Sequence, residues 1–335
     1  MIKWFISPKG EKFLVKDCLE KGLLSDWYPL PYLHMCADER PWTGIPSTTQ
    51  LINGVRLEYL RIFTPYALDP ADQAFRIIGS RAHHTLDKLT PKGSFSELSI
   101  PEEEITGISD LLEQQPDGSW WISDYKVCGS YKVLQALGLE KKKRPAFDEN
   151  GEPIVYKKSG AWGKAGDQKM EDYFEPNPSM INIPEWELQV NRYRIVAEKY
   201  FGIEIPEMRI FMIVRDGGTV TATGRGVYGQ TYYVKVRRLD DDHVNLYFQE
   251  KREKLCGALK AYSDEIAGKT IEGEYDYAAL KENLPSLCTD EERWGGKRCR
   301  EYCAVRHICA WLGNPDLADL RDQMVENKKQ GKEAF

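Results

Sequence analysis

Apolar residues recur at helical spacing in one segment in the first third of the chain. The segment follows the helix-start signal Asp69-Pro70, and its apolar residues stand three or four positions apart. These apolar residues are Phe75, Ile78, Ala82, Leu86 and Leu89. The spacing predicts an amphipathic helix over residues 75–89, and this helix carries Gly79, His83 and Asp87.

A strand pattern around a tight turn comes next. Residues 105–112 and 119–127 are strand-like, and Pro116-Asp117-Gly118 between them is a turn sequence. Two strands joined by so short a turn pair antiparallel. The two segments therefore predict a β-hairpin.

Other segments continue the alternation of helices and strands. Helices are expected at 47–60, after the cap Ser47, at 186–201 and at 240–262, where an aspartate run supplies the cap. Strands are expected at 208–214 and 232–239. The order of the elements predicts an α/β domain with a mixed sheet flanked by helices.

The chain divides into four parts on this pattern. Residues 1–45 are expected to form an N-terminal extension and residues 46–275 the core. Within the core, residues 129–184 are rich in Gly, Pro and Lys and show little periodicity, which indicates an insertion or a flexible loop over the site. Residues 276–315 form a cysteine-rich segment, and residues 316–335 a polar tail.

Composition narrows the class of protein. The chain has 335 residues and a net charge of −6, with no apolar run of membrane-spanning length and no secretory signal at its start. These features predict a cytoplasmic protein in a reducing compartment, with no membrane partner. The negative charge counts only weakly against a nucleic-acid ligand, because basic residues cluster locally.

Two acidic residues and a lysine of the hairpin suggest hydrolytic chemistry. Asp124 and Lys126 stand two apart on one strand and so share a face, and Asp110 lies near the end of the partner strand. Two carboxylates that converge repel each other unless a divalent cation such as Mg²⁺ or Mn²⁺ lies between them. Such a cation can activate water for attack on a phosphodiester. Taken alone, an Asp-x-Lys tripeptide is common and is most often a surface feature.

Two helices carry further candidates. His83 lies one turn after Gly79 and is a candidate third metal ligand, with His84 as its competitor. The alternative for a single histidine is a hydrogen-bonded, partly buried imidazole. Gln189 and Tyr193 share a helix face and suit phosphate or base contacts, although an ordinary helix face explains them equally well.

Four cysteines cluster near the C-terminus. Cys288, Cys299, Cys303 and Cys309 lie within one short stretch, which in a reducing compartment indicates a metal site. Thiolates suit either Zn²⁺ or a 4Fe-4S cluster, and His307 is a competing zinc ligand.

These motifs, in this order, resemble a known family. Gly79-Ser80-Arg81-Ala82-His83, Gly107-x-x-Asp110, Asp124-Tyr125-Lys126 and Gln189-x(3)-Tyr193 are similar to motifs of RecB-type nucleases in the PD-(D/E)xK superfamily. The terminal cysteines resemble the iron–sulfur motif of AddB-type nucleases and of CRISPR-associated RecB-like exonucleases, and phage-borne relatives share the layout.

The resemblance implies a restriction-endonuclease-like core with a cysteine-clamped C-terminal segment. It also implies roles for single residues. His83, Asp110, Asp124 and the Tyr125 carbonyl would bind the catalytic Mg²⁺ or Mn²⁺, and Lys126 would be the catalytic lysine. Gln189 and Tyr193 would position DNA, and Asp87 would support the site.

The chain departs from the family at one cluster ligand. Relatives often take their first cysteine from a Cys-Pro-Arg, where this chain has Asn53-Gly54-Val55-Arg56. Cys288 is therefore assigned as the fourth ligand of the 4Fe-4S cluster, with Cys36 and Cys18 as alternatives.

The resemblance implies a metal-dependent DNA nuclease. The expected activity is that of an exonuclease on single-stranded or end-bearing DNA, in repair, recombination, phage replication or CRISPR adaptation. Protein partners in a recombination or adaptation complex would fit this role. The alternative is a catalytically silent DNA-binding or assembly protein on a nuclease fold.

Overall fold

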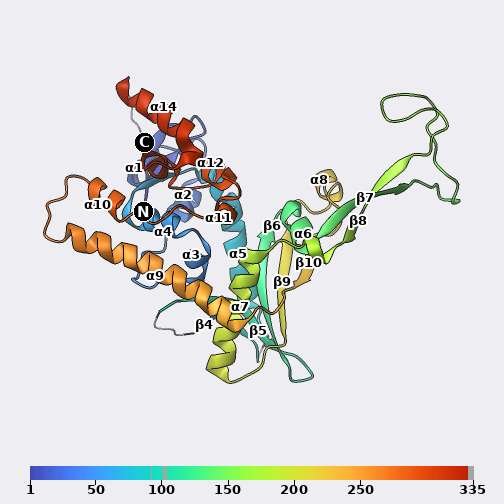
Figure 1. The fold of residues 1–335 in the computed structure, drawn as a ribbon, viewed down its shortest axis with the longest axis horizontal. Coiled ribbons are helices and arrows are strands. Elements are labelled where there is room, and N and C mark those ends of the chain that lie inside the picture. The colour runs from blue at the N-terminus through green and yellow to red at the C-terminus, as the bar shows by residue number, and fades with distance from the viewer. Residues whose placement is uncertain (92, 101–103, 331–335) are drawn as a thin grey trace.

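A five-stranded mixed sheet forms the centre of the computed structural model, which describes residues 1–91, 93–100 and 104–330 (Figure 1). Its strand order is β10-β9-β6-β5-β4. These strands are β4 (Phe95–Ser99), β5 (Ile108–Gln114), β6 (Trp120–Cys128), β9 (Glu207–Val214) and β10 (Thr231–Lys235). Only β6 and β9 run parallel, and helices flank the sheet, so the α/β class with a mixed sheet is confirmed.

The predicted hairpin is present as β5 and β6. Its turn closes through the amide of Gln115, which donates to the Ser119 carbonyl at 2.8 Å. Asp117 accepts from the Ser119 amide at 2.9 Å, and Gly118 takes a positive φ of 86°. A glycine meets this backbone requirement without steric cost.

Helix α7 (Pro184–Phe201) covers one face of the sheet and packs on β5, β6 and β9. The shared core contains Ile122 and Ile210 from the strands and Val190 and Ala197 from the helix, all fully buried. Burial of this apolar surface fixes the position of α7 over the middle of the sheet.

Helix α5 (Ala74–Lys88) confirms the helix expected around His83, but it has no buried residue. Phe75, Ile78 and Leu89 of its apolar pattern are exposed. The guanidinium of Arg215 lies 3.5 Å from the centre of the Phe75 ring and partly covers it. The helical spacing therefore predicted the helix correctly, but it did not predict that its apolar residues would remain unburied.

The single helix expected over 47–60 is two helices, α3 (Thr48–Ile52) and α4 (Val55–Phe63). Ser47 caps α3 in a capping box with Gln50, as the sequence indicated. The break falls at Asn53 and Gly54, both in extended conformations.

The N-terminal segment has a core of its own. Strands β1 (Ile2–Ile6), β2 (Lys12–Leu14) and β3 (Tyr66–Leu68) form a small sheet, and α1 (Val15–Lys21) and α2 (Leu30–Ala37) cover it. Because β1 pairs with β3, this segment is joined to residues beyond the expected extension.

Most of the remaining helices build a second apolar core around α4 and the long helix α9 (Asp241–Ile266). They are α10 (Tyr277–Glu282), α12 (Lys297–Glu301), α13 (Arg306–Trp311) and α14 (Ala318–Lys329), while the short helix α11 (Asp290–Arg293) has no buried residue. The structure also contains the short helices η1 (Pro70–Gln73), η2 (Pro178–Met180), η3 (Pro315–Leu317) and α8 (Val220–Thr223). No helix in the described part of the chain is both long and apolar enough to cross a bilayer.

Residues 129–184, expected as an insertion or a flexible loop, contain regular secondary structure that the sequence did not predict. After α6 (Ser130–Leu137), the strands β7 (Leu139–Pro145) and β8 (Met170–Pro176) form a hairpin arm that projects away from the five-stranded sheet (Figure 1). Its strands are mostly polar on both faces, so they have no alternation of apolar and polar residues that would reveal a strand.

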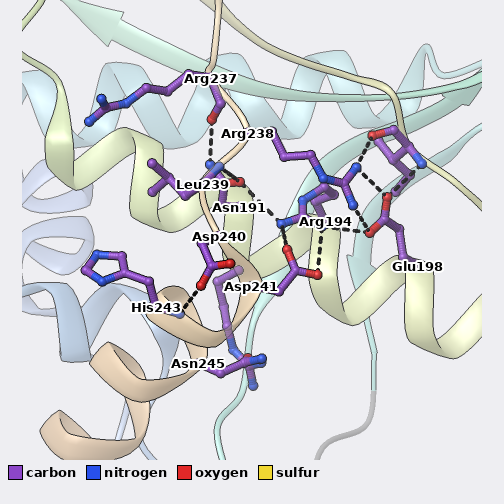
Figure 2. Close-up of polar contacts among 12 residues, drawn as sticks. Asn191, Arg194, Glu198, Arg237, Arg238, Leu239, Asp240, Asp241, His243 and Asn245 are labelled. Carbon is purple, nitrogen blue, oxygen red and sulfur yellow. Dashed lines mark hydrogen bonds and ion pairs between the residues drawn. The ribbon is translucent and has the colours of Figure 1, made fainter.

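A buried polar network ties α7 to the start of α9 (Figure 2). Asn191 donates to the Arg237 carbonyl and accepts from the Leu239 amide, each at 2.9 Å. The side chain of Arg194 is fully buried, and it pairs with Glu198 at 2.7 Å and with Asp241. The network fixes the outer face of α7, while Gln189 and Tyr193 lie on the face turned to the sheet.

We expect Arg194→Met to destabilise the fold by about 2–4 kcal/mol, because it removes a buried charge that several acceptors share. Arg238→Met is the control, since Arg238 belongs to the same network but is half exposed, and it should cost less than about 1 kcal/mol. Urea unfolding measures both changes. Equal costs for the two variants would show that burial of Arg194 does not determine its contribution.

Candidate active site

Asp110 and Asp124 lie opposite each other on neighbouring strands. The register pairs Leu111 with Ser123 and Leu112 with Ile122. Continued by one residue, the same register puts Asp110 opposite Asp124, and directly opposed residues of an antiparallel pair share a face. Both side chains are buried, Asp110 at 8% and Asp124 at 2% exposure. The structure thus brings the two predicted carboxylates together.

Glu97 adds a third carboxylate that the sequence analysis missed. The register of β4 against β5 puts Glu97 opposite Asp110, so Glu97, Asp110 and Asp124 form a row across three strands. Ligand atoms of Glu97, Asp110 and His83 lie within 4.8 Å of one another. The backbone of Glu97 has a φ of +46°, a costly conformation for a residue with a side chain, and such outliers cluster at functional sites.

Asp87 supports this third carboxylate. It lies in the last turns of α5 and accepts a hydrogen bond from the hydroxyl of Ser96, the residue before Glu97. Asp87 thereby connects the helix that carries His83 to the strand that carries Glu97. This position agrees with the supporting role that the resemblance implied.

His83, and not His84, faces the carboxylates. Its Nδ1 lies 3.2 Å from Oδ1 of Asp110, while His84 is exposed. The hydrogen bond to Asp110 raises the pKa of His83 above its usual value, against the effect of burial. The ring of His83 also lies edge-on to that of Tyr125, with centroids 5.9 Å apart.

Tyr125 enters the site through its backbone. Its amide donates to Oδ2 of Asp110 at 2.7 Å, which fixes that carboxylate and leaves Oδ1 directed toward His83. The Tyr125 ring lies edge-on to the ring of Phe211 on β9 as well.

Lys126 connects the carboxylates to α7. Its ammonium lies 2.5 Å from Oδ2 of Asp124 and donates to Oε1 of Gln189 at 3.1 Å. Gln189 in turn donates to the Tyr193 hydroxyl at 3.0 Å. The residue pair predicted on the helix face therefore touches the catalytic lysine candidate, although Tyr193 is almost wholly buried and its ring belongs to the core.

Burial leaves Asp124 short of hydrogen-bond donors. Burial raises the pKa of the Asp124 carboxyl to about 6, while the charge of Lys126 lowers it and that of Asp110 raises it. Within the described chain, Oδ2 of Asp124 has the close ion pair with Lys126 but no donor at hydrogen-bond geometry. A buried carboxylate oxygen in this state is suited to a cation.

Gly107, the glycine of the Gly107-x-x-Asp110 motif, leaves no room for a side chain. A Cβ there would lie 3.1 Å from the Tyr193 ring and 3.0 Å from the Thr48 hydroxyl, so a larger residue would displace Tyr193. Gly79, by contrast, has open space around it. The glycine of the His83 motif is therefore not required by packing within the described structure.

The four C-terminal cysteines lie near one another as free thiols. Asn314 donates to Sγ of Cys309 at 3.4 Å and lies 3.8 Å from Sγ of Cys299. Burial, with a smaller effect of the neighbouring thiols Cys309, Cys299 and Cys288, raises the pKa of Cys303 to about 12. A cation would be needed to hold such buried thiols as thiolates.

Cys288 lies directly against Gly54. A Cβ on Gly54 would stand 2.2 Å from Sγ of Cys288, which leaves no room for any other residue at position 54. The alternative ligands Cys18 and Cys36 lie in the N-terminal core with Phe5, Leu24 and Leu33.

His307, the other candidate ligand at the cysteine cluster, faces elsewhere. It lines a cleft with Trp4, Lys12 and Tyr66. Burial lowers the pKa of His307 to about 4. The His307 ring therefore stays neutral at neutral pH. Its neighbours are the residues of this cleft and not the four thiols.

Comparisons with known proteins do not show a family for this chain. No family model matches, and no curated protein matches. A solved structure entitled "Crystal structure of SSO0001" is similar at a TM-score of 0.32 and 11% identity, covering 69% of this chain and 86% of that one.

Proposed function

We propose that this chain is a metal-dependent DNA nuclease with a restriction-endonuclease-like core. The observation that carries the proposal is one connected site built from segments far apart in sequence. Hydrogen bonds and ion pairs link His83 to Asp110, Asp110 to the Tyr125 amide, and Asp124 through Lys126 to Gln189. These are the residues that the resemblance to RecB-type nucleases singled out.

The donor set fits a hard divalent cation. His83, Glu97 and Asp110, whose ligand atoms lie within 4.8 Å of one another, would hold Mg²⁺ or Mn²⁺. The buried carboxylate of Asp124 and the Tyr125 carbonyl would be further ligands. The 3.2 Å between Nδ1 of His83 and Oδ1 of Asp110 is close to the separation of about 3 Å between adjacent ligands on such an ion. When bound, the cation would lower the pKa of a water and neutralise charge on the phosphate.

The protein's own side chains supply the rest of the chemistry. The Lys126 ammonium would stabilise charge that develops on the phosphate oxygens, and Gln189 holds this ammonium in place. Tyr193 holds Gln189 and is itself fixed by the core, so its role would be to position groups and not to contact a base. The substrate class most consistent with this site is DNA, cut from an end.

The test compares the wild-type chain with Asp124→Asn on end-labelled DNA with Mn²⁺. We expect cation-dependent cleavage by the wild type and a loss of roughly 100-fold or more in the variant, the effect of losing a few kcal/mol of transition-state stabilisation. Asp264→Asn, at an exposed position on α9, is the control and should cleave normally. Cleavage that survives in Asp124→Asn would refute the proposal.

Glu97→Gln tests the third carboxylate. The variant keeps the size of the side chain but loses its charge, so the Mn²⁺ concentration for half-maximal cleavage should rise roughly tenfold, equivalent to about 1.4 kcal/mol. Glu113→Gln on β5 is the matched control, since its odd spacing from Asp110 places it on the opposite face. Identical Mn²⁺ requirements for both variants would remove Glu97 from the ligand set.

The cysteines would hold a metal cluster that joins the C-terminal segment to α4. A tetrahedral zinc ion keeps its sulfur ligands about 3.8 Å apart, given bonds of about 2.3 Å. Among the described residues, no three of the thiols Cys288, Cys299, Cys303 and Cys309 lie within 4.8 Å of one another. This wider spacing supports an iron–sulfur cluster over a single zinc ion.

A further inference from the structure

The hairpin arm has two parts that differ in how their charges are paired. In the shaft, which is β7 and β8, basic residues of one strand pair with acidic residues of the other. Lys141 pairs with Asp172 at 2.6 Å, Arg144 with Glu171 at 2.7 Å, and Lys142 with Glu175. The shaft is therefore internally neutralised, and its charges serve to hold the two strands together.

The tip of the arm, residues 154–169, is different. It carries four lysines, Lys157, Lys158, Lys164 and Lys169, against a single acidic residue, Asp167. No ion pair in the described structure involves any of these lysines. Asp167 is already engaged, since it accepts a hydrogen bond from the Lys164 amide at 3.0 Å. Residues 154–169 thus carry a net charge of +3 on a chain whose net charge is −6, and the acidic residues Asp148, Glu149 and Glu152 lie on the adjoining turn of the same arm.

An exposed tryptophan stands at the end of this basic tip. The turn that carries Trp162 is closed by hydrogen bonds between Gly160 and Gly163, at 2.9 and 3.3 Å. The side chain of Trp162 is 88% exposed, and it makes no ring contact with any described residue. Nothing in the core requires a large aromatic residue here, and such exposure costs solvation free energy.

We propose that the arm tip is a second DNA-binding site, at which Trp162 stacks on a base of a single strand and the lysines contact its phosphates. Basic side chains next to an exposed aromatic ring are the combination by which proteins bind single strands without reading sequence. A protein surface could also bury an exposed tryptophan, and the experiment below separates that outcome from binding of a single strand. The proposal rests on the proposed function for its substrate.

The length of the arm sets a measurable consequence. The seven residues of β7, followed by a similar length of tip, reach about 46 Å from the base of the hairpin at roughly 3.3 Å per residue. At a stacked spacing of about 3.4 Å per nucleotide, that distance equals about 14 nucleotides. A stacked strand of about 6 nucleotides, roughly 20 Å long at that spacing, cannot occupy the active site and the tip together.

Binding is measured first, with a fluorescent single strand of about 30 nucleotides, the full chain and no divalent cation. Trp162→Ala should weaken binding about fivefold or more. The double variant Lys157→Ala, Lys158→Ala should lower the slope of log affinity against log salt by about 1.4. The control is Glu149→Ala on the neighbouring acidic turn of the same arm, which should not weaken binding.

Cleavage then distinguishes the arm from the active site. With Mn²⁺, the arm variants should cut strands of about 6 nucleotides as fast as the wild type and cut the 30-nucleotide strand with a higher KM. Unchanged binding and unchanged KM in Trp162→Ala and in the lysine variant would overturn the proposal and leave the tip to a protein partner. A wild type that binds through the tip but cuts neither strand would refute the nuclease function alone.

Discussion

Lys126→Ala should reduce cation-dependent DNA cleavage by roughly 100- to 1,000-fold, the usual effect of removing one preorganised charge from a phosphate-cleaving site. The ammonium is held by Asp124 on its own strand and by Gln189 on α7, so its position does not depend on substrate. A preorganised charge costs no reorganisation at the moment of reaction, which is why its loss should affect the maximal rate more than substrate binding.

The same variant should shift the pH profile in a direction that the structure specifies. The charge of Lys126 lowers the pKa of the buried Asp124 carboxyl, which burial raises to about 6. Without that charge the pKa rises further, so a larger share of Asp124 is protonated near neutral pH and binds a cation less well. Mn²⁺ binding by Lys126→Ala should therefore need a higher pH than binding by the wild type.

Lys235→Ala is the matched control for this residue. Lys235 lies on β10 of the same sheet, but its side chain is exposed and pairs with Glu207 away from the site. The control should leave both the rate and the pH profile unchanged. If Lys126→Ala and Lys235→Ala cleaved DNA equally well, Lys126 would have no catalytic role.

The local pattern of the chain was sufficient to predict the part of the site that lies on β5 and β6. A turn sequence between two strand-like segments specifies an antiparallel pair, and the positions of Asp110 and Asp124 along that pair follow from the turn. Side chains two apart on β6 then place Lys126 beside Asp124. Each of these steps uses only residues that are close in sequence.

Glu97 could not be found in this way. It reaches the site because β4 pairs with β5 across the stretch that separates them, and its own backbone leaves the extended conformation. Its strand has apolar residues only at Phe95 and Leu98, three positions apart, which is not the alternation that indicates a strand. The signal that would have found Glu97 is therefore its register opposite Asp110, which exists only once the sheet is assembled.

Burial was the property that sequence reasoning predicted least well. The apolar spacing of α5 predicts a helix correctly, yet Ile78 and Leu89 remain exposed although α5 itself contacts β6. Conversely, Arg194 is fully buried although arginine is rarely so, because Glu198 and Asp241 converge on it from two helices. Which helix covers which face of a sheet depends on how all the helices and strands pack together, and the sequence of a single segment does not specify this.

Gly54→Ala should remove metal from the cysteine cluster without touching a cysteine. The added methyl group would stand 2.2 Å from Sγ of Cys288, so Cys288 or the start of α4 must move. Under the proposed function, Cys288 would therefore be the cluster ligand that lies against the start of α4. We expect metal per chain, measured by elemental analysis, to fall at least tenfold, together with the visible absorption of an iron–sulfur cluster.

Two comparisons make this result specific to the cluster. Gly257→Ala on α9 adds the same methyl group into open space, and there it should keep the metal and stabilise the helix by about 0.5–1 kcal/mol. Cys288→Ser should reproduce the loss seen in Gly54→Ala, whereas Cys18→Ser and Cys36→Ser should not, because both thiols lie in the N-terminal core. Full metal content in Cys288→Ser, with loss in Cys36→Ser, would instead place the fourth ligand in that core and would leave the contact between Gly54 and Cys288 as packing alone.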